Sequence, residues 1–183
     1  MKTFFGTKLH STNLYNDKIR RQTVTVIKAE SVTVTQIKTK DKDGYWAVQI
    51  KLGSCKREIR ENDQPSVKVG EQIKAADVLA AGDNLKISGL SKGRGYAGVM
   101  KRHGFHGVGG RTHGQSDRQR HPGSIGMRTT PGRLWKGKRM AGHYGVATMT
   151  VKNLKVVKIE DNLVTVTGTV PGSRNGLLTL TKI

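Results

Sequence analysis

The stretch Leu163-Val164-Thr165-Val166-Thr167-Gly168-Thr169-Val170 alternates between aliphatic and hydroxyl or small side chains. A period of two is typical of a β-strand that turns one face toward a core. The run Thr23–Ile27 is β-branched throughout, and Ser31–Ile37 alternates in the same way. β-branched side chains favour strands because they fit the pleated surface of a sheet. These stretches predict a mainly β protein.

Further strand patterns lie on both sides of a glycine-rich middle segment. They are Tyr45–Leu52, Asn84–Leu90, Thr148–Ile159 and Leu177–Leu180. Short alternating runs with turn residues between them indicate an antiparallel sheet or a small barrel. A short helix is predicted over Ala75–Ala81, ended by Gly82. Because the strand runs flank the middle segment, we expect one discontinuous β domain made of residues 1–90 and 146–183.

The middle segment, Ser91–Gly145, has an unusual composition. Its 55 residues hold 12 Lys or Arg and one acid, Asp117, which gives a net charge of +11. They also hold 14 of the 23 glycines and five of the six histidines of the chain. The segment is therefore predicted to be a basic extension, inserted between strands of the β domain.

No sustained hydrophobic period runs through this extension. Glycine opposes helix formation by about 1 kcal/mol per residue relative to alanine, so no helix is expected over Val99–Gly110. His121-Pro122-Gly123 and Thr130-Pro131-Gly132 have the composition of turns. A disordered basic linker is one interpretation. The large apolar residues of the segment, such as Trp135, favour a segment that orders on a polyanion.

The composition of the whole chain points to the same class of partner. The 183 residues include 33 Lys and Arg against 13 Asp and Glu, so the formal net charge is +20. Such a charge opposes compaction unless a polyanion offsets it. The single cysteine, Cys55, excludes an intramolecular disulfide and a multi-cysteine zinc site. No apolar run approaches the roughly 18 residues of a membrane span, and the apolar part of Met1–Gly6 is too short for a signal peptide. Nucleic acid is the expected partner.

Two glycine motifs resemble nucleotide-binding sites. Gly93-Arg94-Gly95-Tyr96-Ala97-Gly98 fits G-x-G-x-x-G, but a dinucleotide site needs a helix that begins in the motif, and none is expected. Gly132–Lys138 fits G-x-x-x-x-G-K, but Arg139 stands where a magnesium-binding hydroxyl is required. Both motifs can still contact phosphate. Glycine lets the backbone approach a phosphate group closely, and the neighbouring cations neutralise the charge of that phosphate.

Catalytic and metal-binding patterns are weak. His103 and His106 are three residues apart, but no cysteine and only one acid, Asp117, lie nearby in the sequence. Paired-carboxylate chemistry has no candidate in the extension, and no G-x-S-x-G triad signature is present. We therefore expect no cofactor, no metal, no small-molecule substrate and no enzymatic activity. A metal- or nucleotide-dependent enzyme remains the alternative that a bound metal or cofactor would reveal.

A family resemblance is carried by several successive motifs. They are Ser91–Gly98 (SKGRGYAG), Lys101–Phe105 (KRHGF), Thr112-His113-Gly114, Pro122–Gly126 (PGSIG), Thr130–Arg133 (TPGR) and Lys136–Gly142 (KGKRMAG). In this order and spacing they resemble the ribosomal protein L-three family of the large subunit, of bacterial or organellar type. The resemblance extends to Val24–Ile27 and Val170–Ser173, and so covers nearly the whole chain.

The resemblance implies a fold and a role. It implies an antiparallel β-barrel of the translation-protein type, with residues 91–145 as a long loop that penetrates ribosomal RNA toward the peptidyl transferase centre. It also implies binding near the 3′ end of large-subunit RNA, an early role in subunit assembly, and contacts with neighbouring ribosomal proteins. The implied location is a cytoplasmic ribosome, with an organellar ribosome as the alternative. Catalysis belongs to the RNA in this family.

The sequence departs from the family at three places. The N-terminal Gly-Lys-Lys motif of the family is replaced by Gly6–Thr12 (GTKLHST), which leads us to expect a different first turn of the barrel. The region between Cys55 and Gly70 is shorter than in typical bacterial members. Thr129 stands where some relatives carry a methylated glutamine, so that modification cannot occur there.

The extension supplies the candidate RNA-binding residues. Lys and Arg neutralise phosphates, Arg also stacks on bases, and aromatic rings stack on unpaired bases. For the aromatic residues, packing within the protein is an equally weighted alternative. The candidates are Lys92, Arg94, Tyr96, Lys101, Arg102, His103, Phe105, Arg111, His113, Arg118, Arg120, Arg128, Thr129, Thr130, Arg133, Trp135, Lys136, Lys138 and Arg139. A nucleic-acid-binding module outside the ribosome would share the charge but not the order of the motifs.

Overall fold

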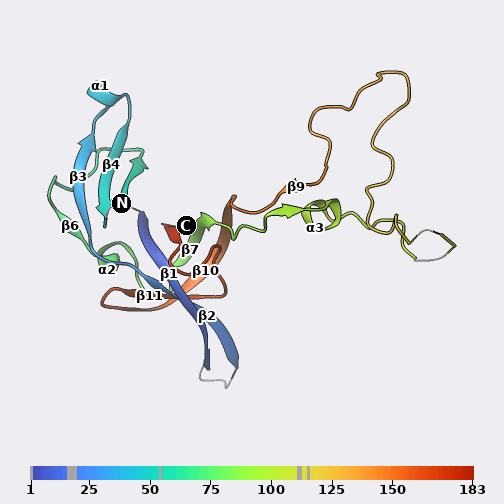
Figure 1. Cartoon of the computed structure of the whole chain (residues 1–183). Coiled ribbons are helices and arrows are strands. Elements are labelled where there is room, and N and C mark those ends of the chain that lie inside the picture. Colours follow the sequence, from blue (N-terminus) through green and yellow to red (C-terminus); the bar gives the residue numbers. More distant parts are fainter. Residues whose placement is uncertain (1, 16–19, 54, 111–112, 115) are drawn as a thin grey trace. The chain divides into compact units, whose positions relative to one another are not determined.

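Six antiparallel strands pair in a closed ring, built from segments that lie far apart in the sequence (Figure 1). The order is β1, β12, β7, β10, β11 and β2, and β2 pairs again with β1. Their bounds are β1 Thr3–Tyr15, β2 Arg21–Lys28, β7 Asn84–Leu90, β10 Thr148–Glu160, β11 Leu163–Thr167 and β12 Leu177–Lys182. This computed structural model describes residues 2–15, 20–53, 55–110, 113–114 and 116–183. The prediction of a mainly β protein is confirmed.

The interior of the ring is filled by the apolar positions of the alternating runs. In β7, Leu85 and Ile87 are fully buried, while Lys86 between them is exposed. Two glycines allow close strand approach: a Cβ at Gly6 would lie 2.7 Å from Ile27 Cγ2, and one at Gly89 would lie 2.7 Å from Leu178 Cδ2. Close-packed interiors leave no room for such added atoms.

A second antiparallel sheet packs on the same core. Its order is β5, β4, β3 and β6, with bounds β3 Val32–Lys38, β4 Trp46–Leu52, β5 Cys55–Glu61 and β6 Gln72–Ile73. Val34, Val48 and Ile50 belong to one buried cluster with Phe4 and Ile87 of the ring. The two sheets therefore share a single hydrophobic core.

Two short helices lie in the connections of this part of the chain, α1 at Lys40–Asp43 and α2 at Ala75–Val78. The prediction of a helix over Ala75–Ala81 is right in place and too long. The helix is one turn, and Leu79 ends it by donating its N–H to the Ala75 carbonyl. Gly82 is not the helix stop: its N–H donates to the Val156 carbonyl in β10.

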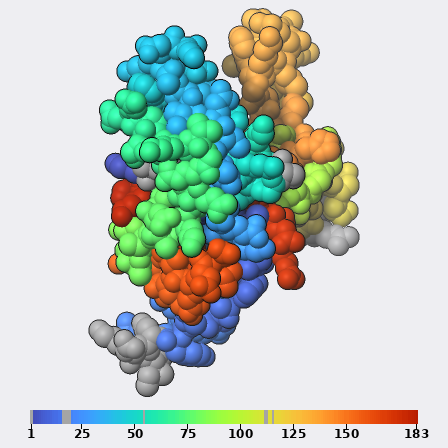
Figure 2. Space-filling model, turned by 90° about the vertical axis from the view of Figure 1, so that its left-hand side faces the viewer, coloured from blue at the N-terminus to red at the C-terminus, as the bar shows by residue number. Residues whose placement is uncertain are grey.

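The longest N-terminal strand was missed by sequence reasoning. β1 has 13 residues, and the Gly6–Thr12 stretch that departs from the family motif lies inside it. Phe4, Phe5 and Gly6 are buried in succession, and the register shifts between Lys8 and His10. A bulge breaks the period of two, so the alternation signal is lost. The ends of β1 and β2 project beyond the rest of the ring (Figure 2).

The chain divides into two compact units. Met1–Ser91 with Thr148–Ile183 is called the ring unit here, and Lys92–Ala147 is called the excursion. The excursion contains β8 (Tyr96–Ala97), α3 (Val99–His103) and β9 (Gly142–His143). α3 contradicts the prediction of no helix over Val99–Gly110. Glycine is absent from Val99–His103, and Gly98 and Gly104 stand at its two ends, so the glycines bound the helix instead of preventing it. None of the helices within the described residues is long and apolar enough to span a membrane.

Candidate nucleic-acid interface

The excursion begins and ends in a paired base, which we define as residues 92–103 and 140–147. Tyr96 pairs with His143 and Ala97 with Gly142 in the β8–β9 ladder. The Arg94 N–H donates to the Tyr144 carbonyl, and the Tyr144 N–H donates to the Gly95 carbonyl, both at 2.9 Å. The backbone of the G-x-G-x-x-G motif is thus bonded to the returning chain, an arrangement that differs from a free phosphate cradle.

Side chains of α3 hold the returning chain at a single carbonyl. Arg102 Nη1 donates to the Met140 carbonyl at 2.6 Å, and His103 Nε2 donates to the same oxygen at 3.1 Å. A Cβ at Gly142 would lie 2.8 Å from Arg102 Nη1, so a larger residue there would displace the guanidinium from this position. Arg102 and His103 therefore have a structural role in the base, and their part in RNA binding stays a prediction.

Most of the predicted RNA-binding residues are exposed. Exposed are Lys92, Arg94, Tyr96, Lys101, His113, Arg118, Arg120, Arg128, Thr129, Thr130, Arg133, Trp135, Lys136, Lys138 and Arg139. Half-buried are Arg102, His103 and Phe105, while Arg111 lies outside the described residues. Most of the candidate cations are therefore available to an external polyanion.

The tyrosine, phenylalanine and tryptophan residues of the excursion separate into two groups. Tyr96 and Trp135 are 73% and 65% exposed. Tyr144 is half-buried under Arg94, whose guanidinium carbon lies 5.2 Å from the ring centroid. Phe105 is also half-buried, with its ring 6.2 Å from that of His103. Tyr96 and Trp135 thus keep open ring surface for stacking, whereas Tyr144 and Phe105 pack within the excursion.

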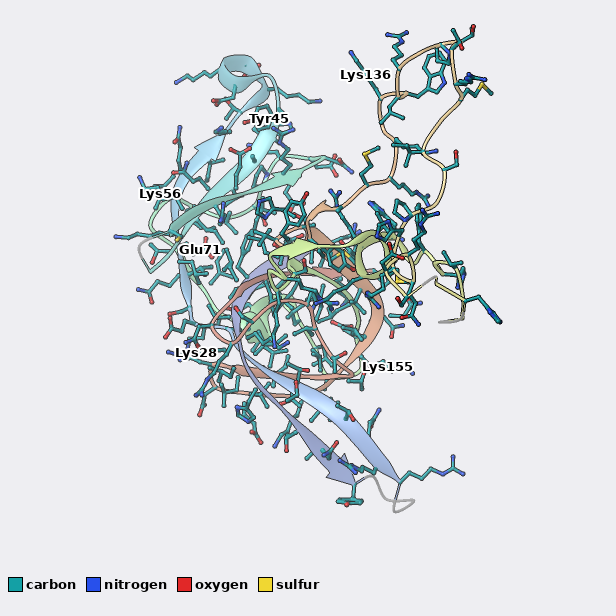
Figure 3. All side chains as sticks on the ribbon, turned by 45° about the vertical axis from the view of Figure 1, so that its right-hand side comes forward. Lys28, Tyr45, Lys56, Glu71, Lys136 and Lys155 are labelled. Atoms are coloured by element: carbon teal, nitrogen blue, oxygen red, sulfur yellow. The ribbon has the colours of Figure 1, made fainter. Side chains whose placement is uncertain are left out.

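The outer part of the excursion, residues 104–139, has no described helix or strand. Figure 1 shows the orange stretch as a wide loop, separate from the yellow stretch before it. Lys136 lies on this loop, among side chains that point in different directions (Figure 3). At its Thr-Pro-Gly turn, Gly132 has φ +63°, and a Cβ there would lie 3.0 Å from the Thr129 carbonyl oxygen. The G-x-x-x-x-G-K stretch over Gly132–Lys138 is therefore an irregular loop, with neither the strand nor the helix of a nucleotide-binding motif.

The acids of the molecule lie mainly in the ring unit. Lys38 of β3 donates to Glu58 of β5 at 2.8 Å, and this hydrogen bond lowers the pKa of Glu58 and raises that of Lys38. Lys182 of β12 bonds Asp83 at 2.8 Å, which lowers the pKa of Asp83 together with the Ala80 N–H. These pairs join neighbouring segments of the fold. Within the described ranges, no three His, Cys, Asp or Glu side chains gather as metal ligands would.

Comparison with known proteins identifies the family of this chain. The model of the family described as "Ribosomal protein L3" matches residues 3–163. The chain belongs to the ribosomal protein L3 family. The family resemblance inferred from the motifs of the excursion is therefore confirmed, and it extends over the ring unit as well.

Bacterial relatives of this family align along almost the whole chain. The chain is 44% identical to the large ribosomal subunit protein uL3 of Herpetosiphon aurantiacus, over 97% of this chain and 94% of the relative. It is 42% identical to the uL3 of Leptospira biflexa, over 100% and 99%, and 43% identical to that of Chlorobaculum tepidum, over 96% and 95%. The Leptospira alignment runs over 206 positions against 183 residues here, a difference of 23, so this chain lacks internal residues that the relative has.

The candidate residues chosen from the sequence leave out the apolar residues of one hollow. Val99, Ile125 and Met140 line a hollow of the excursion together with Tyr96. Met140 and Ile125 lie inside motifs that carried the family resemblance. They were not among the candidates because those were chosen mainly for charge or for an aromatic ring. The signal was their presence as isolated large apolar residues in a stretch that otherwise has few of them.

Proposed function

We propose that this protein is a structural constituent of the large ribosomal subunit and that its excursion binds large-subunit RNA. The observation that carries the proposal is the arrangement of the excursion: 15 of its 19 candidate residues are exposed, and it has 12 Lys or Arg against one acid over Ser91–Gly145. Polyanion binding by such a surface is driven by the release of counterions from the phosphates. The family of the chain is consistent with this role.

The finer role follows from the family resemblance. The ring is proposed to be a barrel of the translation-protein type that rests on the subunit and contacts neighbouring ribosomal proteins. The excursion is proposed to bind near the 3′ end of the RNA, to act early in assembly, and to direct its Thr130-Pro131-Gly132 turn toward the peptidyl transferase centre. The protein has no catalytic part in this proposal, and its place is the ribosome of the cytoplasm.

A charge-reversal pair tests the proposal. The triple variant Arg118→Glu, Arg128→Glu and Arg133→Glu changes three exposed cations of the excursion. The matched variant Lys40→Glu, Lys42→Glu and Lys74→Glu makes the same change of net charge on exposed residues of the ring unit. Each variant, and the wild-type protein beside them, is added to large-subunit RNA and the other subunit proteins during reconstitution, and co-sedimentation with the particles is measured at several salt concentrations.

We expect the excursion variant to be lost from the subunits and the ring-unit variant to be retained. Equal loss of both variants would show that binding depends on net charge and not on the excursion. RNA binding without incorporation of wild-type protein into subunits would instead support a nucleic-acid module outside the ribosome.

A further inference from the structure

The excursion contains a hollow of about 440 Å³ between its base and the outer part. Tyr96 and Val99 line it from the first side of the base, and Met140 from the returning chain. Arg120, His121 and Ile125 line it from the outer part. Aliphatic side chains thus meet an aromatic ring and two basic side chains in one place.

The ring of Tyr96 lies at the edge of this hollow and contacts one other ring. Tyr96 of β8 pairs with His143 of β9. The rings of these two residues meet edge to face, with centroids 5.8 Å apart and an interplanar angle of 77°. Tyr96 as a residue is nevertheless 73% exposed. An aromatic ring that has free surface and a neighbouring ring at its edge offers a platform for stacking.

The cationic group at the hollow is Arg120. Arg120 and His121 are exposed at its rim, and among the described residues no carboxylate lines it. The carbonyl oxygen of Met140 accepts hydrogen bonds from Arg102 and His103. The floor is therefore apolar, and the basic rim attracts negative charge.

We propose that this hollow binds one unpaired nucleobase of RNA, stacked on Tyr96 and lying over Val99, Ile125 and Met140. Arg120 neutralises the phosphate next to that nucleobase. A flat apolar ring joined to an anion matches an aromatic and aliphatic site with Arg120 at its rim, whereas an aliphatic side chain of a protein would leave Arg120 without a partner. The inference rests on the proposed function, because it assigns one contact of the RNA-binding excursion.

The experiment uses the full-length protein and three RNA hairpins of identical stem. One carries a single bulged adenosine, one carries an abasic ribose at the bulge, and one is fully paired. Dissociation constants are measured at one low salt concentration, and the methyl resonances of Ile125 and Met140 are followed by NMR. Base stacking on an aromatic side chain is worth about 5- to 150-fold in affinity.

We expect the wild-type protein to prefer the adenosine bulge over the abasic bulge within that range, with shifts of both methyl resonances only for the adenosine bulge. Tyr96→Phe should keep the preference, and Tyr96→Ala should remove most of it without weakening binding to the abasic hairpin. Tyr15→Ala is the matched control, because Tyr15 is 71% exposed and lies in β1 of the ring unit. It should leave the preference unchanged.

The two proposals fail in different ways. Absence of binding to every hairpin would overturn RNA binding by the excursion itself. Binding with equal affinity for adenosine and abasic bulges, or loss of the preference in Tyr15→Ala and not in Tyr96→Ala, would overturn the nucleobase site and leave RNA binding intact.

Discussion

The ring unit and the excursion differ in how much apolar surface they bury and in how their charges are paired. Among the described residues, the buried hydrophobic side chains belong to the ring unit except for Ala97 and Val99 in the base of the excursion. The described ion pairs all lie in the ring unit as well. A polypeptide that buries little apolar surface cannot offset the entropy of ordering its chain. We therefore expect the ring unit to fold by itself, and residues 104–139 of the excursion to need a partner to become ordered.

Limited proteolysis should show the largest difference between the two units. In the free protein, trypsin should cut first after the basic residues of the outer part, 104–139, and should leave the ring unit resistant. Cleavage of the ring unit requires opening against a stability of roughly 5 kcal/mol or more, so its rate should be lower by more than about a thousandfold. RNA should protect the outer part. Equal resistance of both units without RNA would contradict the comparison.

Two leucine-to-alanine variants compare how much a side chain of each unit contributes to the free energy of unfolding. Leu85→Ala removes a fully buried side chain from the ring and should lower the free energy of unfolding by about 2–5 kcal/mol. Leu134→Ala removes a side chain that is 42% exposed in the excursion and should cost less than about 0.5 kcal/mol. Urea unfolding of the free protein measures both. A large loss for Leu134→Ala would mean that the outer part has a core of its own.

A glycine substitution tests whether shape matters in the excursion beside charge. Gly132→Val introduces a β-branched residue at φ +63° and places its Cβ against the Thr129 carbonyl oxygen. Residues held in this backbone region cost about 1–3 kcal/mol, so incorporation into large subunits should fall by about 5- to 150-fold. Arg118→Ala should reduce incorporation less. If Gly132→Val assembles like the wild type while Arg118→Ala does not, the excursion acts as a charged tether.

The salt dependence of RNA binding should change by a smaller amount. Arg118→Ala removes one exposed cation, and the slope of log affinity against log salt should become shallower by about 0.7–0.9. Binding should weaken at low salt and approach that of the wild type at high salt. Lys40→Ala, on α1 of the ring unit, is the control and should leave the slope unchanged. An unchanged slope in Arg118→Ala would remove Arg118 from the interface.

Acid sensitivity should reveal the smallest effect, and it should be confined to the ring unit. The bond from Lys182 lowers the pKa of Asp83 in the folded state, so this contribution to stability is present at neutral pH. It is lost as the pH falls below the ordinary value of 3.8 and through the lowered value. Asp83→Asn should therefore lower the melting temperature at pH 7. The difference in melting temperature between this variant and the wild type should become smaller in acid. Asp41→Asn, with no ion pair among the described residues, is the control; an equal loss in both variants at pH 7 would contradict this role.

Much of the organisation was determined by the sequence alone. The alternating runs located β2, β3, β4, β7, β10 and β12 to within one or two residues, and β11 at its start. β-branched and hydroxyl side chains in alternation leave few other options, because a helix would scatter them over all its faces. The concentration of glycine and cations separated the middle segment from its flanks, and the order of its motifs identified the family.

Only the tertiary structure decided how the ends of the chain meet. β1 pairs with β12 across nearly the full length of the sequence, and Gly6 lies opposite Leu178 there. Arg102 and His103 meet the Met140 carbonyl from positions 38 and 37 residues away in the chain. α3 and the bulged β1 carry weak local signals, because their conformations depend on partners distant in sequence. Local preferences determine which segments extend, whereas hydrogen bonds and packing between distant segments decide which of them pair, and which cations are bonded within the protein.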